Sequence, residues 1–389
     1  MKKEPRSLTP RYSLTQFAYW TAHTGGTSFA AAFLLEKGLP SGIVGSMLAV
    51  GGLLSCVTQP FMAARADRAR SNIVNPMMIL LTVVSSLCFG LQLLPNLPPM
   101  VYGLLYMTAM WCSDAIVPLI NTLSVSYSQA GYPVNYGMAR SIGSVASAVS
   151  SLALGHIIAG LGITRMIWFL IGSQICSILI LLGYPRIQKS VLHQETDESC
   201  TVPQFFVRYK WYCISLLGVL FLGMYLSMTE NYMIAIMGRL GGDSSHVGNA
   251  LFISSISTVP VIFFFSRIRK KISDPWLLKI SAMTFLLRAV LVLSARYIPM
   301  IYLIQLLHTT SYAFLAPTQV YYAAAHTRPA DITKGQAFIT AAYALGCSAG
   351  NFAGGILLNL SVTSIFLAGV VMALAGTIVF FLTTNKSDL

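Results

Sequence analysis

Three charged side chains lie in the middle of long apolar runs. They are Asp114 in WCSDAIVP, Glu230 in LSMTENYM and Arg288 in FLLRAVLV. A charge in hydrocarbon costs roughly 2.5–3.5 kcal/mol on insertion scales, so such residues are candidates for function. Burial raises the pKa of a carboxyl group and a nearby cation lowers it, so a carboxylate whose surroundings alternate between the two can load and release a proton. We therefore expect Glu230 or Asp114 to carry a proton, and Arg288, which cannot be the carrier, to expel it.

Structural roles compete with this interpretation. Asp114 could be bonded to a neighbouring helix, and Glu230 with Arg288 could form a static buried ion pair. Asn121 follows Asp114 by seven residues, close to two helical turns, so the two residues fall on nearly the same helical face.

Further polar and aromatic residues in the apolar runs are candidates for ligand contact. His308 is grouped with the proton residues because imidazole titrates near neutral pH. Arg140 offers a fork of donors for a hydroxyl or carboxylate, or else it snorkels to the membrane surface. Lone histidines and membrane aromatics also serve in packing or as interface anchors. The predicted ligand-binding set is Tyr19, Trp20, His23, Asn121, Arg140, Asn231, Tyr232 and Tyr312.

The elements that must position these residues are transmembrane helices. Charged residues make up 10% of the 389 residues, against about 25% in soluble proteins, and hydrophobic residues make up 55%. Apolar segments of about 20 residues or more predict membrane spans. The expected spans are 13–35, 41–64, 73–94, 100–128, 136–160, 164–184, 209–237, 246–265, 276–295, 299–325, 335–359 and 361–383. The predicted fold class is therefore an all-α membrane protein with twelve transmembrane helices.

The net charge of +13 does not indicate nucleic-acid binding, because the basic residues cluster on alternate loops. The clusters are Lys2, Lys3, Arg6 and Arg11; Arg65, Arg68 and Arg70; Arg186, Lys189, Arg208 and Lys210; Arg267, Arg269, Lys270 and Lys271; and Arg328 and Lys334. The intervening loops hold only Lys37, Arg165, Arg239 and Arg296. This positive-inside asymmetry predicts that both termini are cytoplasmic.

The segment from Tyr184 to Val207 is the only extended polar stretch, and it divides six expected spans from six. We predict a six-helix bundle over 1–184, a cytoplasmic linker with a short interfacial helix over 185–207, and a second six-helix bundle over 208–389. Small residues recur four apart at matching places in spans five and eleven, where they let helices approach closely. They are Gly143, Ser147, Ser151 and Gly155, and Ala342, Gly346, Gly350 and Gly354.

With this arrangement of spans, the chain resembles the major facilitator superfamily over nearly its whole length. The loop Ala63-Ala64-Arg65-Ala66-Asp67-Arg68-Ala69-Arg70 is similar to the signature between helices 2 and 3, with Ala63 in place of the usual glycine. The resemblance implies two pseudo-symmetric bundles and a gating role for Asp67 and Arg68 in this loop.

A narrower resemblance is to the branch with lactose permease, nucleoside permeases and phenylpropionate-permease-like proteins. Three segments show this resemblance. They are the run from Tyr136 to Ser144 (YGMARSIGS), Gly335-Gln336-Ala337 with the glycines that follow, and Leu307-His308. Two departures leave the proton carrier and the substrate open. Asn121 stands where many relatives have Asp, and span ten contains no acid.

Together these features predict a proton-coupled symporter that imports a small polar organic solute, such as a sugar, nucleoside or aromatic acid. Alternatives are a proton-coupled exporter of drugs or sugars and a non-transporting membrane sensor. We expect a monomer in the bacterial inner membrane whose partners are solute, proton and lipid, with no nucleic acid. No enzymatic motif, zinc spacing or CxxC pair occurs among its residues, so we expect no enzymatic activity, no cofactor and no bound metal.

Overall fold

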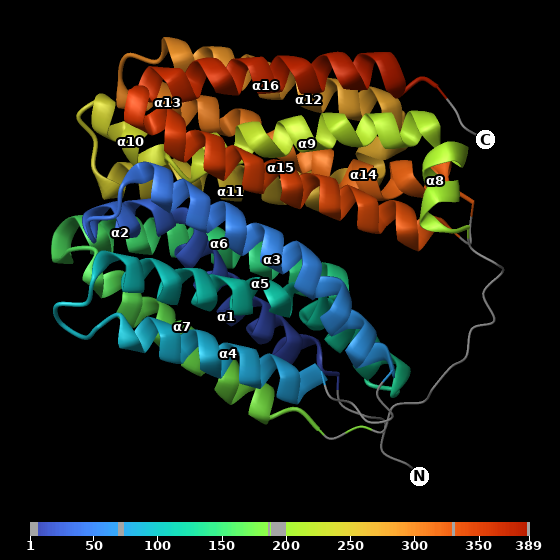
Figure 1. Ribbon diagram of the computed structural model, residues 1–389. Coiled ribbons are helices and arrows are strands. Elements are labelled where there is room, and N and C mark those ends of the chain that lie inside the picture. The colour runs from blue at the N-terminus through green and yellow to red at the C-terminus, as the bar shows by residue number, and fades with distance from the viewer. Residues whose placement is uncertain (1–6, 69–73, 186, 188–199, 329–330, 387–389) are drawn as a thin grey trace. The chain divides into compact units, whose positions relative to one another are not determined.

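The computed structural model describes residues 7–68, 74–185, 187, 200–328 and 331–386. These residues form helices joined by short loops, with no strand among them (Figure 1). The chain divides into two compact units. Unit 1 comprises residues 1–193 with 243–252, and unit 2 comprises 194–242 with 253–389.

Unit 1 is a bundle of long helices in which α1 is central. α1 packs against α6 and α7, α4 packs against α5 and α7, and α3 packs against α5. The helices are α1 (Thr9–Ser28), α2 (Ala30–Glu36), α3 (Ser41–Arg68), α4 (Val74–Leu91), α5 (Pro99–Gln129), α6 (Tyr136–Leu161) and α7 (Thr164–Leu182).

Unit 2 is built in the same way around α9. α9 packs against α15 and α16, and α12 packs against α14 and α16. The helices are α8 (Val202–Arg208), α9 (Lys210–Glu230), α10 (Met233–Arg239), α11 (Ser244–Arg269), α12 (Asp274–Ser294), α13 (Ile298–Leu306), the 3₁₀ helix η1 (Leu307–Thr309), α14 (Tyr312–His326), α15 (Ile332–Leu360) and α16 (Val362–Thr383). The first residues of α11, up to Phe252, belong to unit 1.

Eleven helical segments in the described part of the chain are long and apolar enough to cross a membrane. They match eleven of the expected spans. The expected first span, 13–35, is divided at Phe29 into α1 and α2, and α1 carries many polar residues. The count of twelve transmembrane helices therefore stays a prediction, as do the boundaries of the two predicted bundles.

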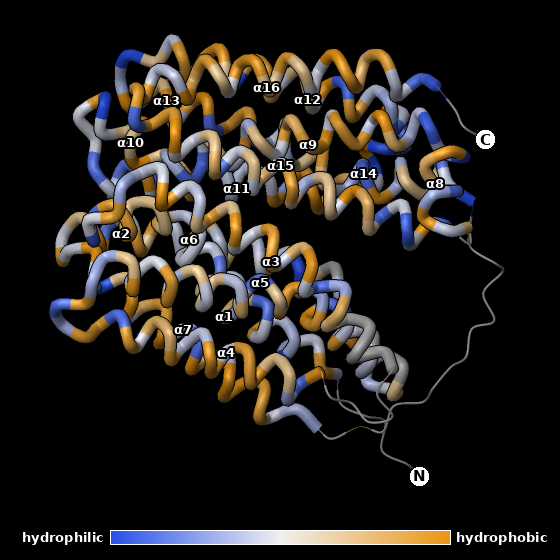
Figure 2. Tube along the Cα trace, viewed as in Figure 1, coloured by the Kyte–Doolittle hydropathy of each residue, from blue (hydrophilic) through white to orange (hydrophobic). Residues whose placement is uncertain are grey.

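Apolar side chains cover the outer surfaces of these helices, as expected for contact with lipid. Large examples include Phe61, Phe263 and Leu360, which are all about 70% exposed. Figure 2 shows that hydrophobic residues run along the helices and that hydrophilic residues gather mostly at their ends. Prolines lie inside α3, α5, α11 and α14, as is tolerated in membrane helices.

Close helix contacts occur at the predicted small residues. A Cβ atom on Gly346 or Gly350 would lie 2.2 Å from a backbone oxygen or side-chain oxygen of α9, so α15 can approach α9 only because these residues are glycine. In unit 1, Gly143 accommodates the Trp20 ring of α1. The small residues of spans five and eleven thus serve packing, as predicted.

The end of the predicted linker contains a helix. α8 begins at a capping box formed by Thr201 and Gln204. Residues 186 and 188–199 of the linker lie outside the described residues.

Candidate functional site

A buried arginine organises the polar centre of unit 2. Arg288 of α12 is 3% exposed. Its Nη1 lies 2.8 Å from Nδ1 of His308 and donates to Oγ of Ser311 at 3.2 Å, while Nη2 donates to Oε1 of Gln305 at 2.7 Å. In the described part of the chain its hydrogen-bond partners are all neutral. The guanidinium charge is therefore stabilised by neutral polar side chains of α13, of η1 and of the residue before α14.

This contact fixes the tautomer of His308. Because a guanidinium group only donates hydrogen bonds, Nδ1 of His308 must accept, and the neutral imidazole then carries its proton on Nε2. That Nε2 lies 3.9 Å from Oε1 of Glu230, whose side chain is 30% exposed. Arg288, His308 and Glu230 therefore form a row with the imidazole in the middle and the carboxylate at its more accessible end.

Local breaks in helices deliver these residues to the row. Glu230 is the last residue of α9, and α10 begins at Met233. The segment between them is held by Asn351 of α15, whose Oδ1 accepts from Asn231 at 2.6 Å and whose carbonyl accepts from Tyr232 at 2.8 Å. His308 lies in the 3₁₀ turn η1. A break at each position frees a side chain from regular helix geometry.

A cavity of about 250 Å³ adjoins the row. It lies between α14 and α15 and is lined by Tyr312, Gln319, Gln336, Thr340 and Tyr343 among others. The Tyr312 ring stacks on His308 with centroids 5.2 Å apart. The cavity therefore combines aromatic faces with hydroxyl and amide groups, which suit a small polar ligand.

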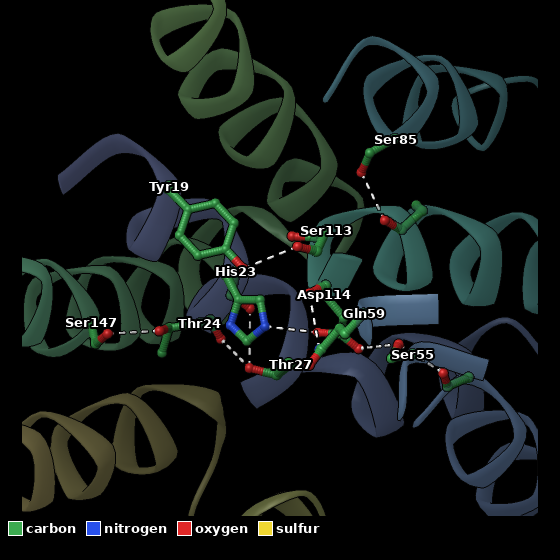
Figure 3. Close-up of polar contacts among 12 residues, drawn as sticks. Tyr19, His23, Thr24, Thr27, Ser55, Gln59, Ser85, Ser113, Asp114 and Ser147 are labelled. Atoms are coloured by element: carbon green, nitrogen blue, oxygen red, sulfur yellow. Dashed lines mark hydrogen bonds and ion pairs between the residues drawn. The ribbon is translucent and has the colours of Figure 1, made fainter. Parts of the chain in front are cut away.

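Unit 1 contains a second histidine–carboxylate pair, drawn in Figure 3. Oδ1 of Asp114 on α5 lies 2.8 Å from Nε2 of His23 on α1, and Oδ2 accepts from Oγ of Ser55 on α3 at 2.9 Å. Nε2 of Gln59 donates to the backbone carbonyl of Asp114 at 3.1 Å. His23 of α1 and Ser55 of α3 thus both contact the carboxylate that α5 supplies.

Aromatic residues surround the pair on α1. Trp20 stands between His23, with ring centroids 5.2 Å apart, and Arg140 of α6, whose guanidinium lies 4.4 Å from the Trp20 ring. Tyr19 is 4% exposed and donates its hydroxyl to the carbonyl of Ser113 at 3.0 Å. Trp20 and the half-buried Arg140 therefore offer a cationic, aromatic surface, whereas Tyr19 is buried with its hydroxyl hydrogen-bonded to the backbone.

The family follows from the sequence at this point. A profile of the MFS_1 like family matches residues 10–368. The chain belongs to this family. The matched range includes both polar centres, and the resemblance to the major facilitator superfamily is confirmed.

Solved transporter structures share the fold of this MFS_1 like protein. A mutant of the nucleoside transporter NupG superposes with a TM-score of 0.83 at 14% identity, covering 97% of this chain and 100% of that one. A bacterial homologue of the human lysosomal transporter Spinster gives 0.70 at 12% identity, covering 97% and 96%. A POT family transporter in complex with 5-aminolevulinic acid gives 0.71 at 12%, covering 96% and 94%. No curated protein matched in sequence. The chain is therefore a multi-pass membrane protein with a major facilitator transporter fold.

Several predicted residues lie apart from the two centres. Asn121 is exposed, and its Oδ1 accepts from the hydroxyl of Tyr136 at 3.2 Å rather than meeting the Asp114 group. Tyr232 is buried, and its hydroxyl donates to the backbone carbonyl of Asn351 on α15. Asp67 and Arg68 end α3, and their side chains lie outside the described residues.

Sequence reasoning missed the amides and hydroxyls that complete both centres. They are Ser55, Gln59, Gln305, Ser311 and Asn351. Gln59, Gln305 and Asn351 stand in apolar spans, where an amide is uncommon, and that signal would have found them. A serine in a membrane helix gives no comparable signal, because it can bond the carbonyl of the preceding turn.

Proposed function

We propose that this chain is a proton-coupled symporter that imports a small polar organic solute by alternating access, with Glu230 as the proton carrier. The solute class comprises sugars, nucleosides and aromatic acids, and the nucleoside transport for which NupG is named falls within it. The observation that carries the proposal is the row Arg288–His308–Glu230.

The row can accept and release a proton at one place only. His308 offers no free lone pair, because Nδ1 accepts from Arg288 and Nε2 bears the proton. Glu230 is therefore the group that binds a proton. When the 3.9 Å gap closes to a hydrogen bond of about 2.8 Å, the Nε2–H donor and the Arg288 charge behind it favour the carboxylate, and the proton leaves.

The remaining features of the proposal follow the charge pattern and the family. The protein works as a monomer in the bacterial inner membrane with both termini in the cytoplasm. Its two halves, 1–184 and 208–389, are joined by the cytoplasmic linker 185–207, and the loop with Asp67 and Arg68 takes part in gating. Within unit 1 the proposed solute-binding residues are Arg140, Trp20 and His23, and within unit 2 the proposed solute-binding residue is Tyr312.

A pH-sensitive dye in proteoliposomes tests the reaction. Liposomes containing the purified protein are challenged with single sugars, nucleosides and aromatic acids while external pH is recorded. We expect one solute class to make the outside more alkaline. Solute entry without a proton signal would reduce the protein to a uniporter, and external acidification on solute entry would mean exchange.

The same assay tests the carrier. Glu230→Gln removes the titrating group but keeps the size of the side chain, so we expect about one proton fewer for each solute molecule. Glu36→Gln makes the same chemical change at an exposed position and should keep the wild-type ratio. An unchanged ratio in Glu230→Gln would remove Glu230 from the proposal.

A further inference from the structure

The two units hold equivalent histidine–carboxylate pairs with the residue types exchanged. In unit 1, the first helix α1 supplies His23 and α5 supplies Asp114. In unit 2, α9, which occupies the place of α1 in the packing scheme, supplies Glu230, and the α13–η1–α14 segment, which occupies the place of α5, supplies His308. The proposed function uses only the unit 2 pair.

The unit 1 pair lacks the restraint that Arg288 places on His308. Nε2 of His23 faces Oδ1 of Asp114, and in the described part of the chain no residue hydrogen-bonds to its Nδ1. The side chains of His23 and Asp114 are 16% and 25% exposed. A proton from water can therefore bind Nδ1 of His23 and convert the singly negative pair of neutral imidazole and carboxylate into an imidazolium–carboxylate ion pair with no net charge, without breaking the existing contact.

The carboxyl of Asp114 is a second place for the same proton, because the hydroxyl of Ser55 can adjust to it. The Ser55 hydroxyl lies 2.9 Å from Oδ2 of Asp114 and 2.9 Å from the carbonyl of Gly51, but it has only one hydrogen to donate. When that hydrogen points to Asp114, the carboxylate is ionised. When it points to Gly51, the Ser55 oxygen can accept a hydrogen from a protonated Asp114. Both charge states of the pair are thus satisfied by the same positions of heavy atoms.

The charges that face the pair are few. Arg140 of α6 is held against Trp20, next to His23, and opposes a positive charge there. Tyr19 faces the pair from α1, and its hydroxyl is committed to the Ser113 carbonyl. The carboxylate of Asp114 favours the positive charge. A proton on His23 is therefore attracted by the carboxylate of Asp114 and repelled by the guanidinium of Arg140.

We propose that the His23–Asp114 pair is a second proton-binding site, so that each cycle carries two protons with one solute molecule, one in each unit. This inference rests on the proposed function. Asp114→Asn is the matched variant. Its amide oxygen can still accept from His23 and its amide nitrogen can donate to Ser55, but it removes both the carboxyl that could bind the proton and the negative charge that stabilises an imidazolium at His23.

The test is the limit of solute accumulation, with the membrane potential clamped at zero and a pH gradient of about one unit imposed. Each proton carried with a neutral solute raises the limiting concentration ratio by about 10-fold, so two protons give roughly 100-fold. We expect roughly 100-fold for the wild type and about 10-fold for Asp114→Asn. His156→Asn, a change at an exposed histidine, should match the wild type.

The outcomes separate the two proposals. A wild-type limit of about 10-fold would overturn the second proton site and leave symport intact. No accumulation by the wild type would overturn the proposed function itself. If Asp114→Asn keeps the roughly 100-fold limit, the second proton lies elsewhere and the inference is wrong. The wild-type limit decides the number of protons even where a variant does not fold.

Discussion

At the scale of single residues, the central feature is that one arginine determines what its neighbours can do. Arg288 is fully buried, yet in the described part of the chain it contacts only neutral acceptors. The sequence predicted that Arg288 expels a proton from Glu230, with a static ion pair as the alternative. The structure places His308 between the two residues, so the guanidinium reaches the carboxylate through the imidazole.

Replacing Arg288 by lysine tests this arrangement. Lysine keeps the charge but presents a single ammonium group, which cannot reach Gln305, Ser311 and Nδ1 of His308 with the geometry of the guanidinium fork. We expect about 10-fold slower coupled uptake, equivalent to about 1.4 kcal/mol.

The control for that variant is Arg296→Lys, an exposed position just beyond the end of α12. It should leave the rate of coupled uptake unchanged. An Arg288→Lys protein with the wild-type rate of coupled uptake would show that the geometry of the guanidinium fork is not needed.

At the scale of elements, a buried aspartate fastens α8 to the loop before α15. Oδ1 of Asp331 accepts from the backbone N–H of Cys200 at 3.0 Å, and Oδ2 accepts from the hydroxyl of Tyr209 at 2.7 Å. Lys334 donates to the carbonyl of Cys200. Burial opposes ionisation of Asp331, but the hydrogen bonds from Tyr209 and Cys200 and the charge of Lys334 outweigh it, so its pKa is lowered.

This lowered pKa gives a pH dependence of defined sign. An aspartate whose pKa is lower in the folded protein than its unfolded value near 3.9 contributes stability above that value and loses it as the pH falls. We expect Asp331→Asn to lower the free energy of unfolding by about 1–3 kcal/mol at pH 7. The difference from the wild type should shrink below about pH 4, as measured by thermal unfolding in detergent.

Glu36→Gln is the comparison for this prediction as well, since it removes an exposed carboxylate and should not change stability. A destabilisation by Asp331→Asn that stays constant from pH 7 to pH 3 would show that the charge of Asp331 is not the source of its effect.

At the scale of the whole molecule, the sequence predicted the membrane helices well and the polar centres only in part. Eleven expected spans were recovered because hydropathy is a local property of about 20 residues. The breaks after Ser28 and Glu230 were missed, since no proline marks them. Buried charges gave the anchors of both centres, because their cost shows in the sequence.

The partners of these anchors depended on packing between distant helices. His23 and Asp114 are 91 residues apart, and their pairing requires α1 and α5 to meet at one height. No spacing in the sequence encodes that height. Asn121 shows the converse, because helical periodicity placed it near the Asp114 stripe, while the structure turns it to Tyr136.

The most direct test of the proposed function is whether a proton gradient alone drives the solute uphill. Proteoliposomes with equal solute inside and outside are diluted into acidic buffer, and the internal solute concentration is followed with and without a protonophore. Symport predicts accumulation above the external concentration, and its collapse when the protonophore is added. If the internal concentration of a transported solute stays equal to the external one throughout, proton coupling is contradicted.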